Sequence, residues 1–179
     1  MPSATTRVVR HDAVDSNSQR NQMDAIALLK ADHKAVAKLF REYKAAKKKD
    51  SPSRADIVAE ASKALSIHAA IEEQVFYPAV REEVPKLEDD ILESLEEHHV
   101  LKWTLEEIAA IGVDDERYDP KVTVMMEQVR HHVEEEETDW FPKVRAALPR
   151  ARLQELGAQL ERAKKTAPRT PNPDRVVAR

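Results

Sequence analysis

The stretch SIHAAIEEQVFYP, residues 66–78, decides how this sequence folds. Apolar residues recur every four positions from Ile67 to Val75, and this spacing predicts one face of an α-helix. His68 and Glu72 are also four residues apart, so their side chains share a helix face about one turn apart. The segment therefore predicts a helix that carries an imidazole and a carboxylate beside its apolar stripe.

The same phrase occurs again as VRHHVEEEETDWFP, residues 129–142. When FYP is placed over WFP, the two segments are offset by 64 residues. His68 then falls on His132, and Glu72 falls on Glu136. This second copy has the same order of imidazole, carboxylate, aromatic pair and proline, which indicates an internal repeat.

A second alignment extends the repeat to the preceding helices. ADHKAVAKLF (31–40) lies over EEHHVLKWTL (96–105) at an offset of 65, which places His33 on His98. Each of these histidines lies in line with the apolar stripe of its own helix. The chain therefore consists of two copies of one helical hairpin, and each copy supplies a histidine followed by His-x-x-x-Glu.

Breaks at 47–53, 84–90 and 112–120 separate four long periodic segments, and a shorter one follows at about 150–164. Long helices with short connections predict an all-α protein, an antiparallel up-down-up-down four-helix bundle with a short C-terminal helix. We expect residues 1–20 to form a flexible arm, 21–149 the bundle, and 150–179 the short helix and a disordered tail.

The composition excludes several classes of protein. The 179 residues contain no cysteine, which excludes disulfides, cysteine-ligated iron–sulfur clusters and thiolate zinc sites. The net charge of −4 gives no electrostatic basis for a nucleic-acid partner. No segment is long and apolar enough for a membrane helix, and none has the pattern of a secretory signal. We therefore expect a cytoplasmic monomer or small homo-oligomer with no nucleic-acid or membrane partner.

The repeat predicts that four imidazoles and two carboxylates meet inside the bundle. Two carboxylates buried together without counter-charge would be costly, and metal cations would offset that cost. Carboxylates can bridge two ions while imidazoles bind terminally, and a set of nitrogen and oxygen donors suits iron or manganese and permits zinc. A single His-x-x-x-Glu is more often a surface pair, so it is the repetition that favours a metal site. The candidate ligands are His33, His68, Glu72, His98, His132 and Glu136.

Neighbouring residues leave an alternative open. His131 and Glu135 have the same spacing as His132 and Glu136, so the two pairs could exchange roles. His99 and His131 lie about 100° around the helix from the histidines that the repeat supports, which favours exposed positions for both.

Taken together, these motifs resemble the hemerythrin-like, or HHE cation-binding, family over residues 22–148. The segments that carry the resemblance are ADH, HAAIEEQVFYP, EEHH and HHVEEEETDWFP. The resemblance implies an antiparallel four-helix bundle around a non-heme di-iron centre, oxo- or hydroxo-bridged. It also implies that the six candidate residues are the iron ligands, with Glu72 and Glu136 bridging.

One position departs from the family pattern. Oxygen-carrying hemerythrins have a further histidine on the third helix, four residues after the first, and here the place after His98 holds Lys102. The resemblance therefore does not imply reversible oxygen carriage. The open position would take water, substrate or a side chain such as His99. Lys102 either faces outward or stands near the site, where its charge would favour anionic oxygen species.

Three function hypotheses follow. The first is a di-iron protein for oxygen, nitric oxide or peroxide, acting with a redox partner either as an enzyme of peroxidase or catalase type or as a binder or sensor. The second is a ferritin-like oxidase or iron store, which needs Glu-x-x-His on two helices, whereas only Glu96 and His99 have that spacing. The third is a metal-independent helical interaction module with pH-sensitive histidines. The spacing favours the first.

Overall fold

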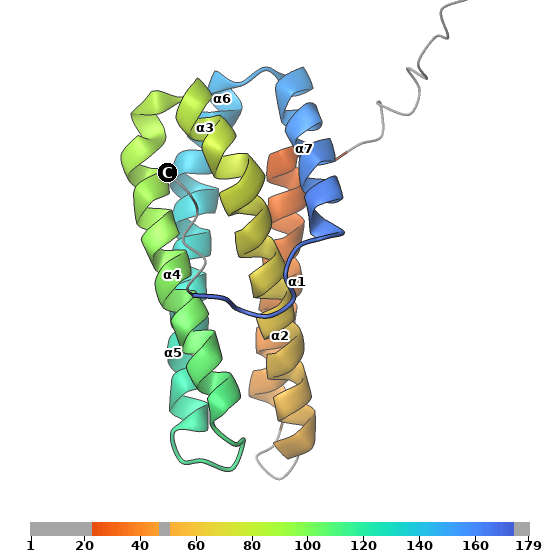
Figure 1. Cartoon of the computed structure of the whole chain (residues 1–179), viewed down its shortest axis with the longest axis vertical. Coiled ribbons are helices and arrows are strands. Elements are labelled where there is room, and N and C mark those ends of the chain that lie inside the picture. The colour runs from red at the N-terminus through yellow and green to blue at the C-terminus, as the bar shows by residue number, and fades with distance from the viewer. Residues whose placement is uncertain (1–22, 47–50, 174–179) are drawn as a thin grey trace, which may run out of the picture.

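The computed structural model describes residues 23–46 and 51–173, with the side chains of residues 51 and 52 left out. The described residues contain helices and no strand, which confirms the predicted all-α class. Four long helices run up and down the molecule, and a fifth lies beside them (Figure 1). The predicted N-terminal arm, 1–20, lies outside the described residues.

The first hairpin consists of α1 (Ala25–Ala45) and a longer helical rod. The rod begins as α2 (Ser51–Ile71), widens through one π-helical turn, η3 (Glu72–Phe76), and continues as α3 (Tyr77–Glu83). The rod is thus one continuous helix with a local widening before Pro78.

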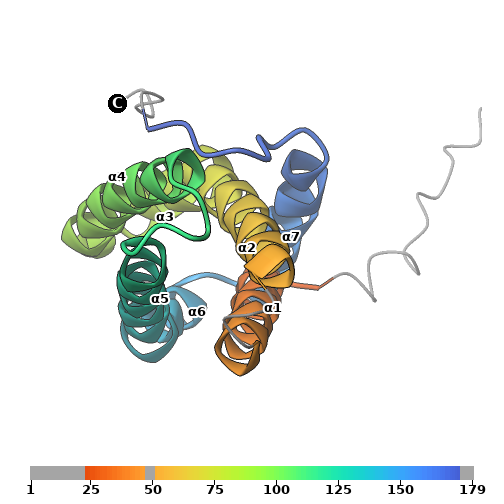
Figure 2. The ribbon, with the colours of Figure 1, turned by 90° about the horizontal axis from the view of Figure 1, so that it is seen from below.

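The second hairpin repeats this design. A 3-10 turn, η4 (Pro85–Leu87), leads into α4 (Glu88–Ala110), and a loop then leads to α5 (Tyr118–Glu135). A second π-helical turn, η5 (Glu136–Trp140), joins α5 to α6 (Phe141–Ala147). Seen along the bundle, the two hairpins pack against each other with α7 outside the first (Figure 2). No helix within the described ranges has the length and apolar character needed to span a membrane.

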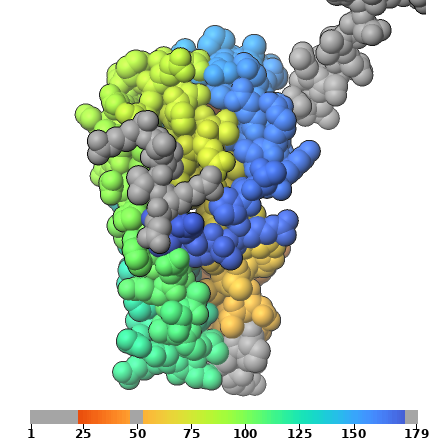
Figure 3. Space-filling model, in the orientation of Figure 1, coloured from red at the N-terminus to blue at the C-terminus, as the bar shows by residue number. Residues whose placement is uncertain are grey.

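The short C-terminal helix, α7 (Arg150–Lys164), packs against α1 and α2. Gly157 allows this close approach, because a Cβ at that position would lie 2.2 Å from the backbone oxygen of Met23. After α7 the chain crosses α2 towards α4 as an irregular segment (Figures 1 and 3), and Ala167 packs against the core. Residues 174–179 of the expected tail lie outside the described part of the chain.

The core consists of two apolar clusters with a polar layer between them. On α1, Leu29 belongs to one cluster and Val36 to the other, and His33 lies between them. On α2, His68 likewise lies between Leu65, which belongs to the same cluster as Val36, and Ile71, which belongs to the same cluster as Leu29. The long helices therefore carry polar side chains across the middle of the bundle at one level.

Candidate metal centre

All six predicted residues converge in this layer. One group combines His33 and His68 with both carboxylates, and the other combines His98 and His132 with Glu72. The ligand atoms in each group lie within 4.8 Å of one another, and Glu72 belongs to both groups. Both glutamates are fully buried, and no histidine of the set is more than 7% exposed.

The two glutamates reach this position from the π-helical turns. Glu72 begins the first turn and Glu136 begins the second. In each turn a backbone N–H five residues on bonds to the carbonyl of the glutamate. Pro78 and Pro142 follow one residue later and have no N–H for an ordinary helical bond, so proline explains why the helix departs from regular geometry here. The aromatic–proline endings therefore shape the site itself, in addition to closing it.

A carboxylate faces the Nδ1 atom of every one of the four histidines. Three contacts are hydrogen bonds: His33 to Glu137 at 2.9 Å, His98 to Glu73 at 3.1 Å and His132 to Glu97 at 2.7 Å. His68 Nδ1 lies 3.5 Å from Asp32 Oδ2, beyond good hydrogen-bond length. We call Asp32, Glu73, Glu97 and Glu137 the outer carboxylates. Such partners fix the ring orientation and tautomer of metal-binding histidines.

These contacts turn the Nε2 atoms of the histidines inward. An imidazole that donates from Nδ1 carries a lone pair at Nε2. His33 and His68 bring their Nε2 atoms to 3.1 Å, and His98 and His132 bring theirs to 3.2 Å. Two lone pairs at these distances repel each other unless a proton or a cation lies near both. The arrangement suits two cations, one for each pair.

The buried carboxylates indicate the same need for positive charge. Burial raises the pKa of Glu72 well above its usual value, and the charge of Glu136 adds to the effect. Burial acts in the same direction on Glu136, but the imidazoles of His132 and His33 outweigh it and lower the pKa of that carboxyl. Glu72 Oε1 has no hydrogen-bond partner among the described residues, and Glu136 Oε2 faces only imidazoles, with His33 Nε2 at 3.1 Å and His132 Nε2 at 3.7 Å. Buried unpaired carboxylate oxygens are expected where metal ions bind.

Lys102 stands behind the site and not in it. Its ammonium group donates to both oxygens of Glu73, at 2.6 and 2.8 Å, and Glu73 in turn holds His98. Burial alone would raise the pKa of Glu73, but the hydrogen bonds from His98 and Lys102 outweigh it and lower the pKa. The sequence left open whether Lys102 faces outward or stands near the site. The structure shows an intermediate position: the lysine side chain is mostly buried, but the Glu73 carboxylate separates it from the ligand atoms.

Tyr77 is the functional candidate that sequence analysis missed. Its hydroxyl donates to Glu136 Oε1 at 3.1 Å and lies 3.4 Å from Glu72 Oε2 and 3.5 Å from His98 Nε2. The repeat did contain a signal, because the equivalent residue of the second copy is Phe141, which stacks on His33 without a hydroxyl.

A cavity of about 390 Å³ reaches the inner histidines. The apolar side chains of Leu101, Val129, Val36 and Leu65 line it. Exposed residues of α4 and α5, among them His131, also line it, so the cavity opens between these two helices.

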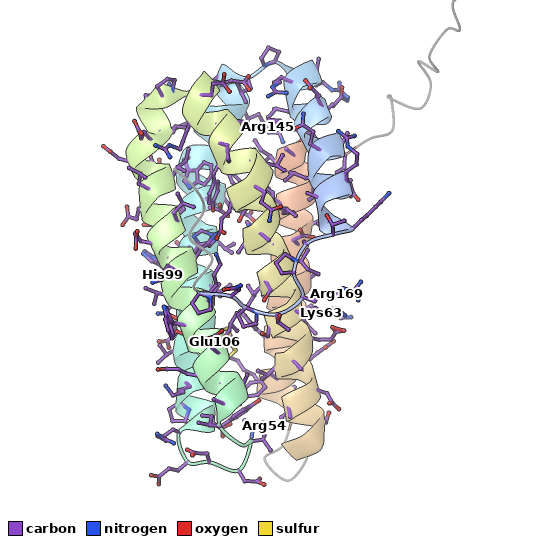
Figure 4. All side chains as sticks on the ribbon, viewed as in Figure 1. Arg54, Lys63, His99, Glu106, Arg145 and Arg169 are labelled. Atoms are coloured by element: carbon purple, nitrogen blue, oxygen red, sulfur yellow. The ribbon has the colours of Figure 1, made fainter. Side chains whose placement is uncertain are left out.

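The alternative pair His131 and Glu135 lies outside the inner cluster. The side chain of His131 is 65% exposed, whereas His132 and Glu136 point inward. His99 lies on the outer surface of α4 (Figure 4), where its ring accepts a hydrogen bond from the Trp103 indole at 3.3 Å. It is therefore remote from the open ligand position that we considered for it.

Comparisons with known proteins show the family of this chain. The sequence profile described as Hemerythrin HHE cation binding domain matches residues 24–144. A DNA nickase of Nostoc sp. is 28% identical over 152 residues, 85% of this chain and 42% of that protein, so the chain spans less than half of that relative. The crystal structure of a hemerythrin HHE cation-binding domain-containing protein from Mycobacterium kansasii superposes with a TM-score of 0.66 at 25% identity, over 80% of this chain and 89% of that one. The match to the family profile covers most of the chain, and the buried histidine–glutamate cluster lies within it, so the chain belongs to the hemerythrin HHE cation-binding domain family.

Proposed function

We propose that the inner cluster holds two iron ions and that the protein binds or reacts with oxygen, nitric oxide or peroxide there. The observation that carries this proposal is the pairing of inward Nε2 atoms on both sides of two buried carboxylates. One ion would take His33 and His68, and the other would take His98 and His132. Glu72 and Glu136 would bridge them.

The donor set supports iron in preference to most other metals. It contains nitrogen and carboxylate oxygen only, which suits iron or manganese, and zinc also tolerates such donors. When bound, a pair of iron ions would supply electrons and open coordination positions for a small ligand. The largely apolar cavity beside the histidines supports a ligand of this kind, because it offers small uncharged molecules a path to the buried site.

The protein's own residues orient the ligand imidazoles and supply a hydrogen-bond donor. The outer carboxylates hold the imidazoles with Nε2 inward, and their negative charge makes those nitrogens better ligands. Burial and the nearby glutamates raise the pKa of Tyr77 well above its usual value, so its phenol keeps its proton at neutral pH. Tyr77 therefore presents an O–H donor at Glu136 Oε1, on the side of the site near His98. The second copy, with Phe141, offers no such donor.

The test is anaerobic loading with ferrous iron, followed by separate additions of oxygen, nitric oxide and peroxide while the absorption spectrum is recorded. We expect two tightly bound ions per chain and new charge-transfer bands after oxidation. A spectrum that reverses when oxygen is removed would indicate binding, and continuous consumption of peroxide would indicate an enzyme. Absence of bound iron and of any new band would refute the proposal.

His98→Ala and His99→Ala form a matched pair for the same experiment. The two residues are neighbours on α4, but one points inward and the other is exposed. His98→Ala should lose bound iron and the bands, whereas His99→Ala should behave as the wild type. Chelation should lower the melting temperature of the wild type, because metal binding stabilises the folded state. A metal-independent interaction module would show no such change.

The other candidate functions receive less support. The single Glu-x-x-His, Glu96 with His99, lies on the exposed face of α4, so it does not supply a ferritin-like site. We do not extend DNA nicking to this chain, because the match covers 42% of that relative and a net charge of −4 gives no general attraction to DNA.

A further inference from the structure

One of the four outer carboxylates, Glu97, differs from the other three in having no lysine partner among the described residues. Three of them pair with a lysine: Glu137 with Lys30 at 3.2 Å, Glu73 with Lys102 at 2.6 Å and Asp32 with Lys164 at 2.6 Å. Glu97 has no lysine or arginine within ion-pair distance in the described part of the chain. It faces His131 and Glu135 instead, and one donor atom from each of these three residues lies within 4.8 Å of the others.

The internal repeat shows that this group is specific to the second hairpin. In the first hairpin the residues equivalent to His131 and Glu135 are Ile67 and Ile71, which cannot bind a metal ion. The equivalent of Glu97 is Asp32, and Lys164 neutralises it. One half of the molecule thus closes this position with a lysine and apolar side chains. The other half leaves two carboxylates and an imidazole side by side, where a cation would supply the charge that lysine supplies elsewhere.

The group also lies on the way into the bundle. Glu97 and His131 line the cavity that reaches the inner histidines, and the acidic residues Glu93 and Glu96 line its mouth. Glu97 Oε2 accepts the hydrogen bond from His132 Nδ1, so this carboxylate contacts the inner cluster on one side and the outer group on the other. Negative charge at the mouth of a cavity attracts cations and raises their rate of entry.

We propose that Glu97, His131 and Glu135 form an outer site for a divalent transition-metal ion, through which ions reach the inner centre. A mixed set of one imidazole and two carboxylates suits manganese, ferrous iron or zinc more than calcium or magnesium. The site is partly open, since the side chains of His131 and Glu135 are 65% and 43% exposed. It would therefore bind more weakly than the inner centre and exchange its ion readily. It does not depend on which small ligand the inner centre takes.

The test compares wild type with a double variant, His131→Ala with Glu135→Gln, using Mn²⁺ as the probe. Loss of the aqueous Mn²⁺ signal in electron paramagnetic resonance measures how many ions bind and how tightly. The control is His99→Ala with Glu134→Gln, which removes the same two chemical groups from exposed neighbouring positions. Wild type and control should bind one Mn²⁺ more than the double variant, or bind the last ion at least about tenfold more tightly. Equal numbers and affinities in all three proteins would overturn the outer site.

Two further measurements complete the test. Anomalous diffraction from crystals soaked in Mn²⁺ should place an ion between the three side chains, and ions at other positions only would contradict the proposal. Stopped-flow loading of metal-free protein with ferrous iron should be about tenfold slower in the double variant, with the same final amount at the inner centre. If the double variant loses the outer ion but loads iron at the wild-type rate, the delivery role is refuted and the outer site is not. If no iron enters the inner centre but the outer difference persists, the proposed function and the delivery role both fail, and only the outer metal site stands.

Discussion

Replacement of Tyr77 by phenylalanine removes one hydroxyl from the centre of the polar layer. That hydroxyl donates to Glu136 Oε1 at 3.1 Å, and the side chain is 1% exposed. The aromatic ring stays in place and keeps its stacking on His98, with ring centroids 5.5 Å apart. Phe141 occupies the equivalent position of the second copy, so the helix accepts phenylalanine after a π-helical turn.

The magnitude follows from the hydrogen bond. A hydrogen bond to a charged acceptor contributes about 1.5–3 kcal/mol to stability. The second contact, to Glu72 Oε2 at 3.4 Å, is near the limit of a hydrogen bond and adds little. The ring is retained, so no cavity forms. Tyr77→Phe should therefore lower the unfolding free energy of the metal-free protein by about 1.5–3 kcal/mol. At about 2–4 °C per kcal/mol for a chain of this size, the melting temperature should fall by roughly 3–12 °C.

The assay is urea unfolding of chelator-treated protein at pH 7, followed by far-ultraviolet circular dichroism. Tyr118→Phe is the control, because Tyr118 is also buried, and its hydroxyl makes no hydrogen bond within the described ranges. This control should change the unfolding free energy by less than about 0.5 kcal/mol. The reasoning is refuted if Tyr77→Phe leaves the unfolding midpoint unchanged, or if the control costs as much.

Three other outcomes follow from the packing and from the buried histidines. Gly157→Ala should destabilise the protein by about 1–3 kcal/mol in urea unfolding, because the new methyl group would meet the backbone oxygen of Met23; a neutral effect would show that α7 does not pack as described. Arg54, which lies at the lower end of the bundle (Figure 4), is buried and pairs with Asp119, so Arg54→Met should cost about 1–3 kcal/mol in thermal unfolding, and wild-type stability would contradict that role. Burial lowers the pKa of His68 to about 4, so between pH 6.5 and 4 only the unfolded chain binds that proton, and the metal-free protein should lose up to roughly 3 kcal/mol as the pH falls through this window. A urea midpoint that stays constant from pH 7 to pH 4.5 would exclude this contribution.

The inner cluster could be predicted from the sequence because equivalent residues of the two repeat copies are separated by nearly constant offsets of 64 and 65 residues. Residues four apart share a helix face in any α-helix, so His68 with Glu72 and His132 with Glu136 needed no tertiary information. The same offset favoured His132 over its neighbour His131 without excluding the exchange, and the structure turns His132 inward.

The contacts behind the cluster could not be predicted, because they join helices far apart in the sequence. Glu137 lies 104 residues from His33, and Lys164 reaches Asp32 from a helix outside the four-helix bundle. In the sequence, Glu137 and Lys164 stand out only as members of charged runs. Which of them turn inward depends on how the helices cross and rotate against one another.

The sequence by itself determined the helices, their antiparallel order and the six inward residues, because helical periodicity and an internal repeat are local properties of the chain. Only the tertiary structure decided what Tyr77, Lys102 and Glu97 do. Tyr77, directly after the first π-helical turn, lies against the carboxylates. Glu73 holds Lys102 away from the ligands, and Glu97 has no lysine beside it in the described part of the chain. Each outcome depends on distances between different helices, and residue spacing along one helix does not set those distances.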